Sequence, residues 1–209
     1  SVPFNSANGS AVQPGDYAAS SGTLNFDGAL GQTRTITVPA VGDTILEGNE
    51  IFSVGLGTPS NAAIGISDAS GTGTITNDDS ASIAIGNRTL AEGNLGSTVF
   101  SFDVTLSGAV QDGFSVPYAT ADDTATTPAD YGNVSGPLNF SGSNGEVRSI
   151  SIPVVGDTVP EPDERFFVNL GAPSVAGIAV ATAQGSGQIV NDDLGADIVV
   201  TVDNGASGL

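Results

Sequence analysis

The chain has 209 residues, of which 23 are acidic and only four are basic, and its formal net charge is −19. This charge disfavours nucleic acid and anionic membranes as partners and favours cations or basic surfaces. Cysteine and histidine are absent, which excludes disulfides, thiolate and imidazole metal sites, cysteine nucleophiles and histidine general bases. No segment resembles a membrane span, so direct membrane insertion is not expected.

Short apolar runs separated by Gly, Ser, Thr, Asn and Asp, with no sustained helical period, predict an all-β chain. In "VFSFDVTLS", residues 99–107, Phe100 and Phe102 alternate with polar residues and define a core-facing side. The same alternation later in the chain places Phe166 in the core and leaves Phe167 exposed. The predicted strands are residues 82–86, 97–107, 113–120, 136–141, 146–154, 164–170 and 177–190. Seven short strands with turns between them predict a β-sandwich.

The chain contains a tandem duplication with a constant offset of 114 residues. "PGDY" at Pro14 recurs as "PADY" at Pro128, and "VGDT" at Val41 recurs as "VGDT" at Val155. Across the 79 paired positions, 39 are identical, and no gap is needed. We therefore predict two modules of one fold.

The two copies differ in length. Residues 80–193 form a complete copy, whereas residues 1–79 begin at what is already the third strand and lack the first two. Residues 194–209 contain "ADIVVTVDN", which loosely parallels "ASIAIGN" at Ala81. We expect this tail to be the start of a further module or a strand donated to another subunit.

Acidic residues recur in both copies, in turns that a sandwich brings to one end, because successive strands run in opposite directions. These turns are the loop before "DY", the loop between the fifth and sixth strands, and the exit of the last strand. In the first copy they contain Asp16, Asp43, Glu47, Glu50, Asp78 and Asp79, and in the second Asp130, Asp157, Glu161, Glu164, Asp192 and Asp193. The second copy also contains Glu92.

Carboxylates gathered at one end repel each other by roughly 1–4 kcal/mol per close pair, so a neutralising cation is expected. A ligand set of oxygen atoms alone suits a hard cation, and the irregular arrangement favours Ca²⁺ over Mg²⁺. The number of carboxylates is compatible with more than one ion at each end. The alternative interpretation is that these residues only shape turns, which Asp and Asn favour for backbone reasons and which a duplication would copy.

The second copy, "PADYGNVSGPLNFSGSNGEVRSISIPVVGDTVPEPDERFFVNL…GSGQIVNDD", resembles the Calx-beta domain. The matching elements are "DY", "G-x-L-x-F", "D-x-x-x-E-x-x-E-x-F-x-V-x-L" and the closing "G-x-G-x-I-x-N-D-D". This family occurs in the calcium-sensing modules of sodium/calcium exchangers and in bacterial surface proteins. The resemblance implies tandem immunoglobulin-like antiparallel β-sandwiches.

The resemblance also implies a ligand set. The calcium ligands of the second copy would be Glu92, Asp130, Asp157, Glu161, Glu164, Asp192 and Asp193, and those of the first Asp16, Asp43, Glu47, Glu50, Asp78 and Asp79. The sequence departs from the family at Gly42 and Gly156, where other members carry Asp, and at Asn77 and Asn191, which replace an acid. The remaining acid of the second loop, Asp163, has Asn49 as its counterpart, so we expect it to be a solvated neighbour and not a ligand.

We expect a non-catalytic, calcium-binding structural module of an extracellular, bacterial cell-surface protein such as a stalk, adhesin or filament, in which Ca²⁺ stiffens the array. The junction "NDDSAS" between the two copies is short, so one ion bound there could be shared by both modules and fix the angle between them. The alternative is a calcium-sensing regulatory module. Glycoside cleavage by paired carboxylates is disfavoured, because tryptophan is absent and only three tyrosines are present. Two of these, Tyr17 and Tyr131, are expected in the core.

The expected partners are neighbouring repeats or identical subunits. If the first copy lacks two strands, its open core and unpaired edges could accept a strand from another subunit, and head-to-tail donation of "ADIVVTVDN" would give a filament. The simpler explanation is that the chain is part of a longer repeat protein.

Overall fold

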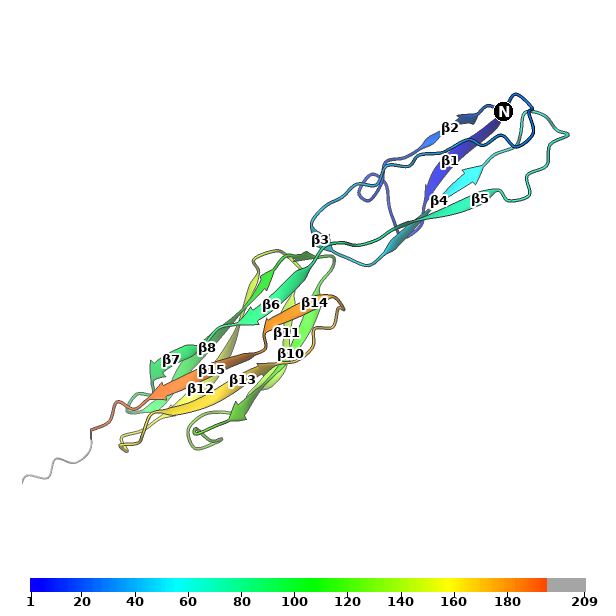
Figure 1. Cartoon of the computed structure of the whole chain (residues 1–209). Coiled ribbons are helices and arrows are strands. Elements are labelled where there is room, and N and C mark those ends of the chain that lie inside the picture. The colour runs from blue at the N-terminus through cyan, green and yellow to red at the C-terminus, as the bar shows by residue number, and fades with distance from the viewer. Residues whose placement is uncertain (195–209) are drawn as a thin grey trace, which may run out of the picture. The chain divides into compact units, whose positions relative to one another are not determined.

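The computed structural model describes residues 1–194 and divides into two compact units. The first unit contains Ser1–Ala81 and Gly108–Asp112, and the second contains Ser82–Ser107 and the chain from Gly113 onward. The described residues form strands and turns, as the sequence predicts (Figure 1). None of them forms a helix long and apolar enough to cross a membrane. The tail "ADIVVTVDN" lies outside the described residues.

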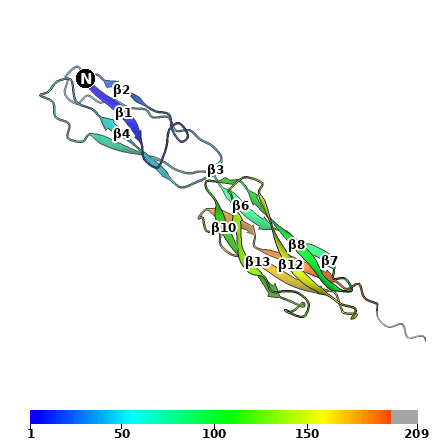
Figure 2. The same cartoon turned by 180° about the vertical axis from the view of Figure 1, so that it is seen from behind.

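The second unit is a β-sandwich of two sheets (Figure 2). One sheet has the order β11 (Ser135–Phe140), β10 (Phe114–Asp122), β13 (Glu164–Leu170), β15 (Gln184–Val190) and β7 (Arg88–Ala91). The other has the order β12 (Val147–Gly156), β8 (Gly96–Ser107), β6 (Ala81–Ile85) and β14 (Ile178–Thr182). Strand β10 pairs antiparallel with β11 and β13, β13 with β15, and β8 with β12 and β6, whereas β15 pairs with β7 in parallel.

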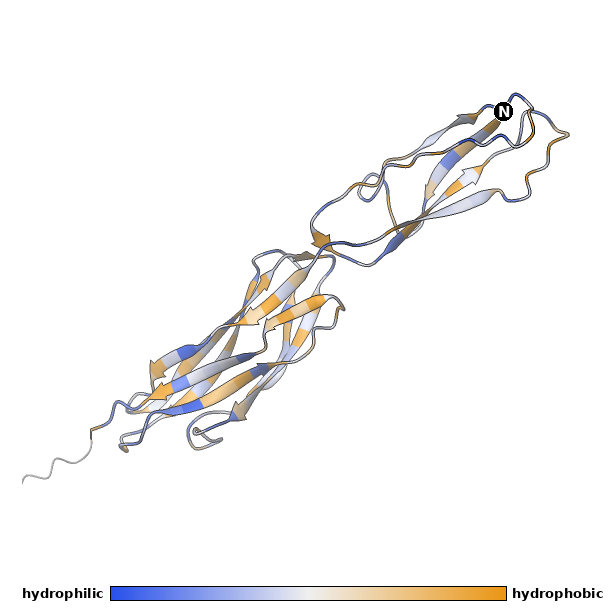
Figure 3. Ribbon diagram, in the orientation of Figure 1, coloured by the Kyte–Doolittle hydropathy of each residue, from blue (hydrophilic) through white to orange (hydrophobic). Residues whose placement is uncertain are grey.

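Aromatic side chains from the facing sheets form the core of this sandwich. Phe100 and Phe102 of β8 lie 5.9 and 5.8 Å, centroid to centroid, from Phe166 of β13. All three rings are at most 1% exposed, which confirms the predicted core-facing side. Apolar residues therefore alternate with polar ones along the strands (Figure 3). Phe167, predicted to be exposed, is only half-exposed, because the Arg165 guanidinium lies 5.1 Å above its ring.

Two details of the strand prediction are wrong. The short strand β7 is absent from the predicted set, because it pairs at a sheet edge and three of its four residues are exposed, so it has no clear apolar alternation. The single predicted strand 177–190 is two strands, β14 and β15, separated at Ala183. The break is needed because β14 belongs to one sheet and β15 to the other, so the chain crosses between the layers there.

The first unit contains a four-stranded sheet, with the order β2 (Ser21–Leu24), β1 (Val2–Asn8), β4 (Glu50–Leu56) and β5 (Ser70–Ile75). It corresponds to the β11–β10–β13–β15 sheet of the second unit. A two-residue parallel pairing joins β3 (Ile45–Leu46) to β9 (Ala109–Val110). Residues 33–42 are the counterparts of β12, but they make only an isolated bridge between Tyr17 and Ala40.

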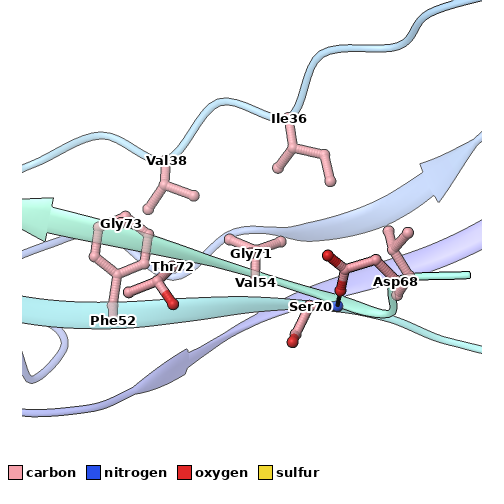
Figure 4. A pocket seen from close by; sticks show the side chains of 10 residues that line it. Ile36, Val38, Phe52, Val54, Asp68, Ser70, Gly71, Thr72 and Gly73 are labelled. Atoms are coloured by element: carbon pink, nitrogen blue, oxygen red, sulfur yellow. Dashed lines mark hydrogen bonds between the residues drawn. The ribbon is translucent and has the colours of Figure 1, made fainter.

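The first unit lacks a second sheet like that of β12 and β8, because the strand that would pair with residues 33–42 is not among its described residues. Strand β12 is held by ten residue pairings with β8, and the described residues of the first unit include no counterpart of β8. The core residues on the surviving sheet are therefore less covered. Phe52 and Val54 line an open groove and are half-exposed (Figure 4), whereas their counterparts Phe166 and Val168 are completely buried.

This difference predicts unequal effects of matched substitutions. Phe166→Ala removes a ring enclosed on all sides and should lower the free energy of unfolding by about 3–5 kcal/mol. Phe52→Ala should cost about half as much, because water already reaches its ring. Hydrogen exchange followed by mass spectrometry separates the two repeats. Equal losses of protection in the two variants would contradict the half-sandwich description.

Candidate metal centre

Each repeat contains a carboxylate cluster at equivalent positions. In the first repeat the cluster consists of Asp16, Glu47 and Glu50, and in the second of Asp130, Glu161 and Glu164. In each case one carboxylate oxygen per residue lies within 4.8 Å of the others. All six residues are half-buried. The two sets are related by the 114-residue offset, so the same loops build both clusters.

A stacked aromatic pair positions two members of each cluster. The Tyr131 ring stacks on Phe166 with centroids 4.4 Å apart. Asp130 directly precedes Tyr131, and Glu164 lies two residues before Phe166 on the same face of β13. In the first repeat, Tyr17 stacks on Phe52 at 4.8 Å and places Asp16 and Glu50 in the same way. Both tyrosines are completely buried, as predicted.

Backbone hydrogen bonds hold the aspartates in place. The backbone N–H of Thr126 donates to Asp130 Oδ2 at 2.7 Å, and the Thr126 hydroxyl also donates to this oxygen. In the first repeat the N–H of Val12 donates to Asp16 Oδ2 at 2.6 Å.

The second repeat contains a further cluster, formed by Glu92, Asp192 and Asp193. Glu92 is only 5% exposed and directly follows β7. The loop after it is tied to the chain's exit from β15, because Gly93 N–H donates to Asp192 Oδ1 at 3.1 Å and Asn94 donates to Asp193 Oδ1. The described residues of the first repeat include no counterpart of Glu92, and Asp78 and Asp79 are not part of a cluster.

The clusters are electrostatically unfavourable without a counter-charge. Burial, followed by the charges of Glu161 and Asp157, raises the pKa of Glu92 to about 7. Burial, followed by the neighbouring Asp130, raises the pKa of Glu164 to about 7. In the first repeat, burial and nearby aspartates also raise the pKa values of Glu47 and Glu50. These interactions link Glu92 to both clusters of the second repeat, so the predicted acidic loops do lie at one end.

The clusters fit a hard cation. Among the described side chains, Glu50 Oε2 and Asp193 Oδ2 are buried oxygens without a hydrogen-bond partner. Such an oxygen is costly to bury unless a proton or a cation reaches it. The donor set consists of oxygen atoms from separate loops, which suits the irregular shell of Ca²⁺ better than the strict octahedron of Mg²⁺.

Asp43 and Asp157, which the sequence also proposes as ligands, lie outside the clusters. Asp43 Oδ1 accepts a hydrogen bond from Ile45 N–H at 2.8 Å, and Asp157 Oδ1 accepts one from Val159 N–H at 2.7 Å. These bonds shape the turn, as the alternative interpretation of Asp residues expects. Both side chains still add negative charge near the clusters, since Asp43 raises the pKa of Glu47 and Asp157 that of Glu92.

Sequence reasoning missed the function of Asn77 and Asn191, which it treated as lost acids. Asn191 Oδ1 accepts a hydrogen bond from Glu161 N–H, and its Nδ2 donates to the Asp193 carbonyl. Asn77 makes the same two contacts with Glu47 and Asp79. The amide accepts with its oxygen and donates with its nitrogen, whereas an ionised Asp has no donor and could not make both contacts. The signal available in the sequence was the retention of Asn in both copies.

Asp163 and its counterpart Asn49 also have a shared structural function. Asp163 Oδ1 accepts a hydrogen bond from Asn191 N–H at 3.2 Å, and Asn49 Oδ1 accepts one from Asn77 N–H at 3.0 Å. An acceptor is all that this position requires, so Asp and Asn are interchangeable there. Asp163 is outside the clusters.

Steric contacts explain why position 156 is occupied by glycine. A Cβ on Gly156 would lie 2.1 Å from the Gly93 carbonyl oxygen and 2.8 Å from that of Glu92. A larger residue would push away the loop that carries Glu92. A Cβ on Gly42, its counterpart, would meet no atom within 4 Å, because the described part of the first repeat lacks this loop.

The Calx-beta domain is the family whose model matches the chain, over residues 1–80 and again over residues 76–193. The chain therefore belongs to the Calx-beta domain family and contains two tandem copies of the domain. This finding confirms the resemblance inferred from the sequence, and the structure confirms the all-β fold.

The similar proteins include the sodium/calcium exchanger Calx of Drosophila melanogaster, with 27% identity over 176 residues. The match covers 84% of this chain but only 18% of that relative. The apo form of the Calx CBD1 domain is 30% identical, with a TM-score of 0.49, and covers 55% of this chain and 100% of its own. The calcium binding domain CBD12 of CALX1.1 is 19% identical, with a TM-score of 0.44, and covers 90% of this chain and 86% of its own.

The raised pKa values predict a pH-dependent stability of the metal-free protein. Glu92 and Glu164 release protons near pH 4.5 when unfolded and near pH 7 when folded. The folded state therefore loses stability as the pH rises from about 4.5 to 7. Calorimetry in chelator should give a higher melting temperature at pH 5 than at pH 7.5 for the second repeat, and Glu92→Gln should reduce the difference. A melting temperature that rises with pH over this range would contradict the assignment.

The packing of Gly156 predicts a position-specific effect of a single methyl group. Gly156→Ala should lower the free energy of unfolding by about 1–3 kcal/mol, because the methyl group meets backbone atoms of the Glu92 loop. The matched variant Gly42→Ala should change it by less than about 0.5 kcal/mol. Denaturant unfolding measures both, and an equal response of the two variants would rule out the contact.

Proposed function

We propose that the chain is a non-catalytic calcium-binding regulatory module. The observation that carries this proposal is the carboxylate triad that occurs at equivalent positions in both repeats, with oxygen atoms within 4.8 Å of one another. The buried oxygen Glu50 Oε2, which has no hydrogen-bond partner among the described residues, supports a cation and not simply a solvated acidic surface.

In the second repeat, Asp130, Glu161 and Glu164 would hold one ion, and Glu92, Asp192 and Asp193 would hold another. In the first repeat only the triad of Asp16, Glu47 and Glu50 is available. A bound Ca²⁺ supplies the positive charge that offsets the repulsion among these carboxylates. We therefore expect the second repeat to bind more Ca²⁺ than the first.

A regulatory signal would arise from the loops that carry the ligands. Asp130 comes from the loop before Tyr131, Glu161 from the loop between β12 and β13, and Asp192 and Asp193 from the chain after β15. Without an ion these segments repel one another, and with an ion they are drawn together. The state of the site would then be transmitted to the chain that leaves the domain.

The similarity to a sodium/calcium exchanger supports this regulatory function more than the extracellular stiffening function expected from the sequence. Because the chain covers 18% of that exchanger, ion transport is not carried over to it. The structural function at a bacterial cell surface stays a prediction. Scattering with and without Ca²⁺ distinguishes the two functions, since a sensor changes shape on binding, whereas a stiffened stalk keeps its length and gains thermal stability.

Calcium affinity tests the proposal directly. Isothermal calorimetry on the full chain should detect saturable Ca²⁺ binding, and Glu161→Gln should weaken part of it by about tenfold or more, equivalent to about 1.4 kcal/mol. Asp163→Asn is the matched control, because it removes the same charge but keeps the acceptor that Asn49 provides in the first repeat. We expect its affinity to be nearly unchanged.

Two outcomes would contradict the proposal. Absence of Ca²⁺ binding at millimolar concentration would show that the clusters are only acidic surfaces. An equal loss in the Glu161→Gln and Asp163→Asn variants would show that binding depends on general charge and not on the triad.

A further inference from the structure

The side chain of Asn191 connects the two carboxylate clusters of the second repeat. Its Oδ1 accepts a hydrogen bond from the Glu161 N–H at 3.3 Å, and its Nδ2 donates to the carbonyl oxygen of Asp193 at 3.0 Å. Glu161 belongs to the triad, whereas Asp193 belongs to the cluster that contains Glu92. One half-buried amide group is therefore bonded to the backbone of a residue from each cluster.

The loop between β12 and β13 depends on this contact because of its prolines. Glu161 lies between Pro160 and Pro162, and proline has no N–H to donate. The Glu161 N–H is thus the only backbone donor from residue 160 to residue 162, and Asn191 accepts it. The backbone of this triad member is therefore tied to the exit of β15 through one side chain.

The first repeat has the same amide but a different loop. Asn77 Oδ1 accepts a hydrogen bond from the Glu47 N–H at 3.2 Å, and its Nδ2 donates to the Asp79 carbonyl at 3.0 Å. The residue before Glu47 is Leu46, whose carbonyl accepts a further hydrogen bond from the Gln111 N–H at 2.9 Å. The backbone next to Glu47 is therefore supported by a second contact.

Charge and geometry predict opposite effects of an acid at position 191. A carboxylate there would add negative charge beside both clusters, and charge alone would strengthen the binding of a cation. It would keep the acceptor for the Glu161 N–H but lose the donor, so an anionic oxygen would face the Asp193 carbonyl oxygen. Geometry therefore predicts weaker binding, because Ca²⁺ requires its oxygen ligands at about 2.3–2.6 Å.

We propose that Asn191 is a positioning residue for both calcium ions of the second repeat, with its oxygen holding Glu161 in the triad and its nitrogen holding Asp193 in the cluster of Glu92. This inference rests on the proposed function, because it concerns the affinity of the same clusters. Both polar atoms of the amide are engaged with backbone groups, so Asn191 acts through two ligands and is not a ligand itself.

Two substitutions of Asn191 in the full chain test the two contacts. Asn191→Asp keeps the acceptor and loses the donor, so the cluster of Glu92 should bind Ca²⁺ about tenfold more weakly while the triad changes little. Asn191→Ala loses both contacts, and both ions should bind about tenfold more weakly. Asn169→Asp is the matched control, because it adds the same charge on β13, where Asn169 Oδ1 accepts a hydrogen bond from Gln184 outside the clusters. Its calcium affinity should be unchanged.

Two backbone amides report the two clusters separately in an NMR titration with Ca²⁺. The Glu161 N–H reports the triad, and the Gly93 N–H, which donates to Asp192 Oδ1 at 3.1 Å, reports the other cluster. Chemical shifts of both amides in the isotope-labelled full chain give an affinity for each site in every variant.

Hydrogen exchange of the calcium-free chain separates positioning from a general loss of stability. The Glu161 amide should exchange about tenfold faster in Asn191→Ala but stay protected in Asn191→Asp, which retains the acceptor. Amides in the β8–β12 pairing serve as the internal reference, because a general loss of stability would accelerate their exchange as well.

Two results would overturn this inference and leave the proposed function standing. One is tighter calcium binding by Asn191→Asp than by the unmodified chain, because position 191 would then supply a ligand. The other is an equal change of affinity in Asn191→Asp and Asn169→Asp, which would assign the effect to charge. Absence of calcium binding by the unmodified chain would overturn the inference and the proposed function together.

Discussion

The stacking of one tyrosine on one phenylalanine is the constraint on which each repeat depends. In the second repeat, Tyr131 and Phe166 stack at 4.4 Å in the core, and each is close along the chain to a carboxylate of the acidic end. Asp130 is adjacent to the tyrosine, and Glu164 continues the inner face of the strand that carries the phenylalanine. The apolar core therefore leads directly into a cluster of half-buried carboxylates. The fold holds this repulsive arrangement at the edge of its core, where a cation can reach it.

The two repeats show how one loop arrangement gives different binding capacity. Both contain the triad, but the second repeat alone has a described loop with Glu92, and this loop makes the second cluster with Asp192 and Asp193. Gly156 permits the close approach of that loop, since any side chain there would meet backbone oxygen atoms. Asn191 then ties the loop containing Glu161 to the exit of β15. A charge change in one cluster would be felt in the other, because Glu161 raises the pKa of Glu92.

Residues 33–42 and 147–156 show the effect of tertiary context on similar local sequences. Both segments have alternating apolar residues, and Ile36 and Ile150 occupy equivalent positions. The second segment is the long strand β12, because β8 supplies backbone partners along its whole length. The first makes a single bridge. Period-2 patterning therefore specifies which side faces the core, whereas strand formation itself requires a neighbouring strand.

The sequence by itself determined the all-β class, the tandem duplication, the family, the core positions of Tyr17 and Tyr131, and the acidic loops that meet at one end. These features follow from short-range patterns and from the 114-residue offset, which need no knowledge of contacts. Only the tertiary structure separated the clustered carboxylates from Asp43 and Asp157, whose oxygens accept turn hydrogen bonds. It also explained Asn77, Asn191 and Gly156, and it revealed β7 and the crossing at Ala183. These depend on which atoms of distant segments approach each other, and local residue patterns do not contain that information.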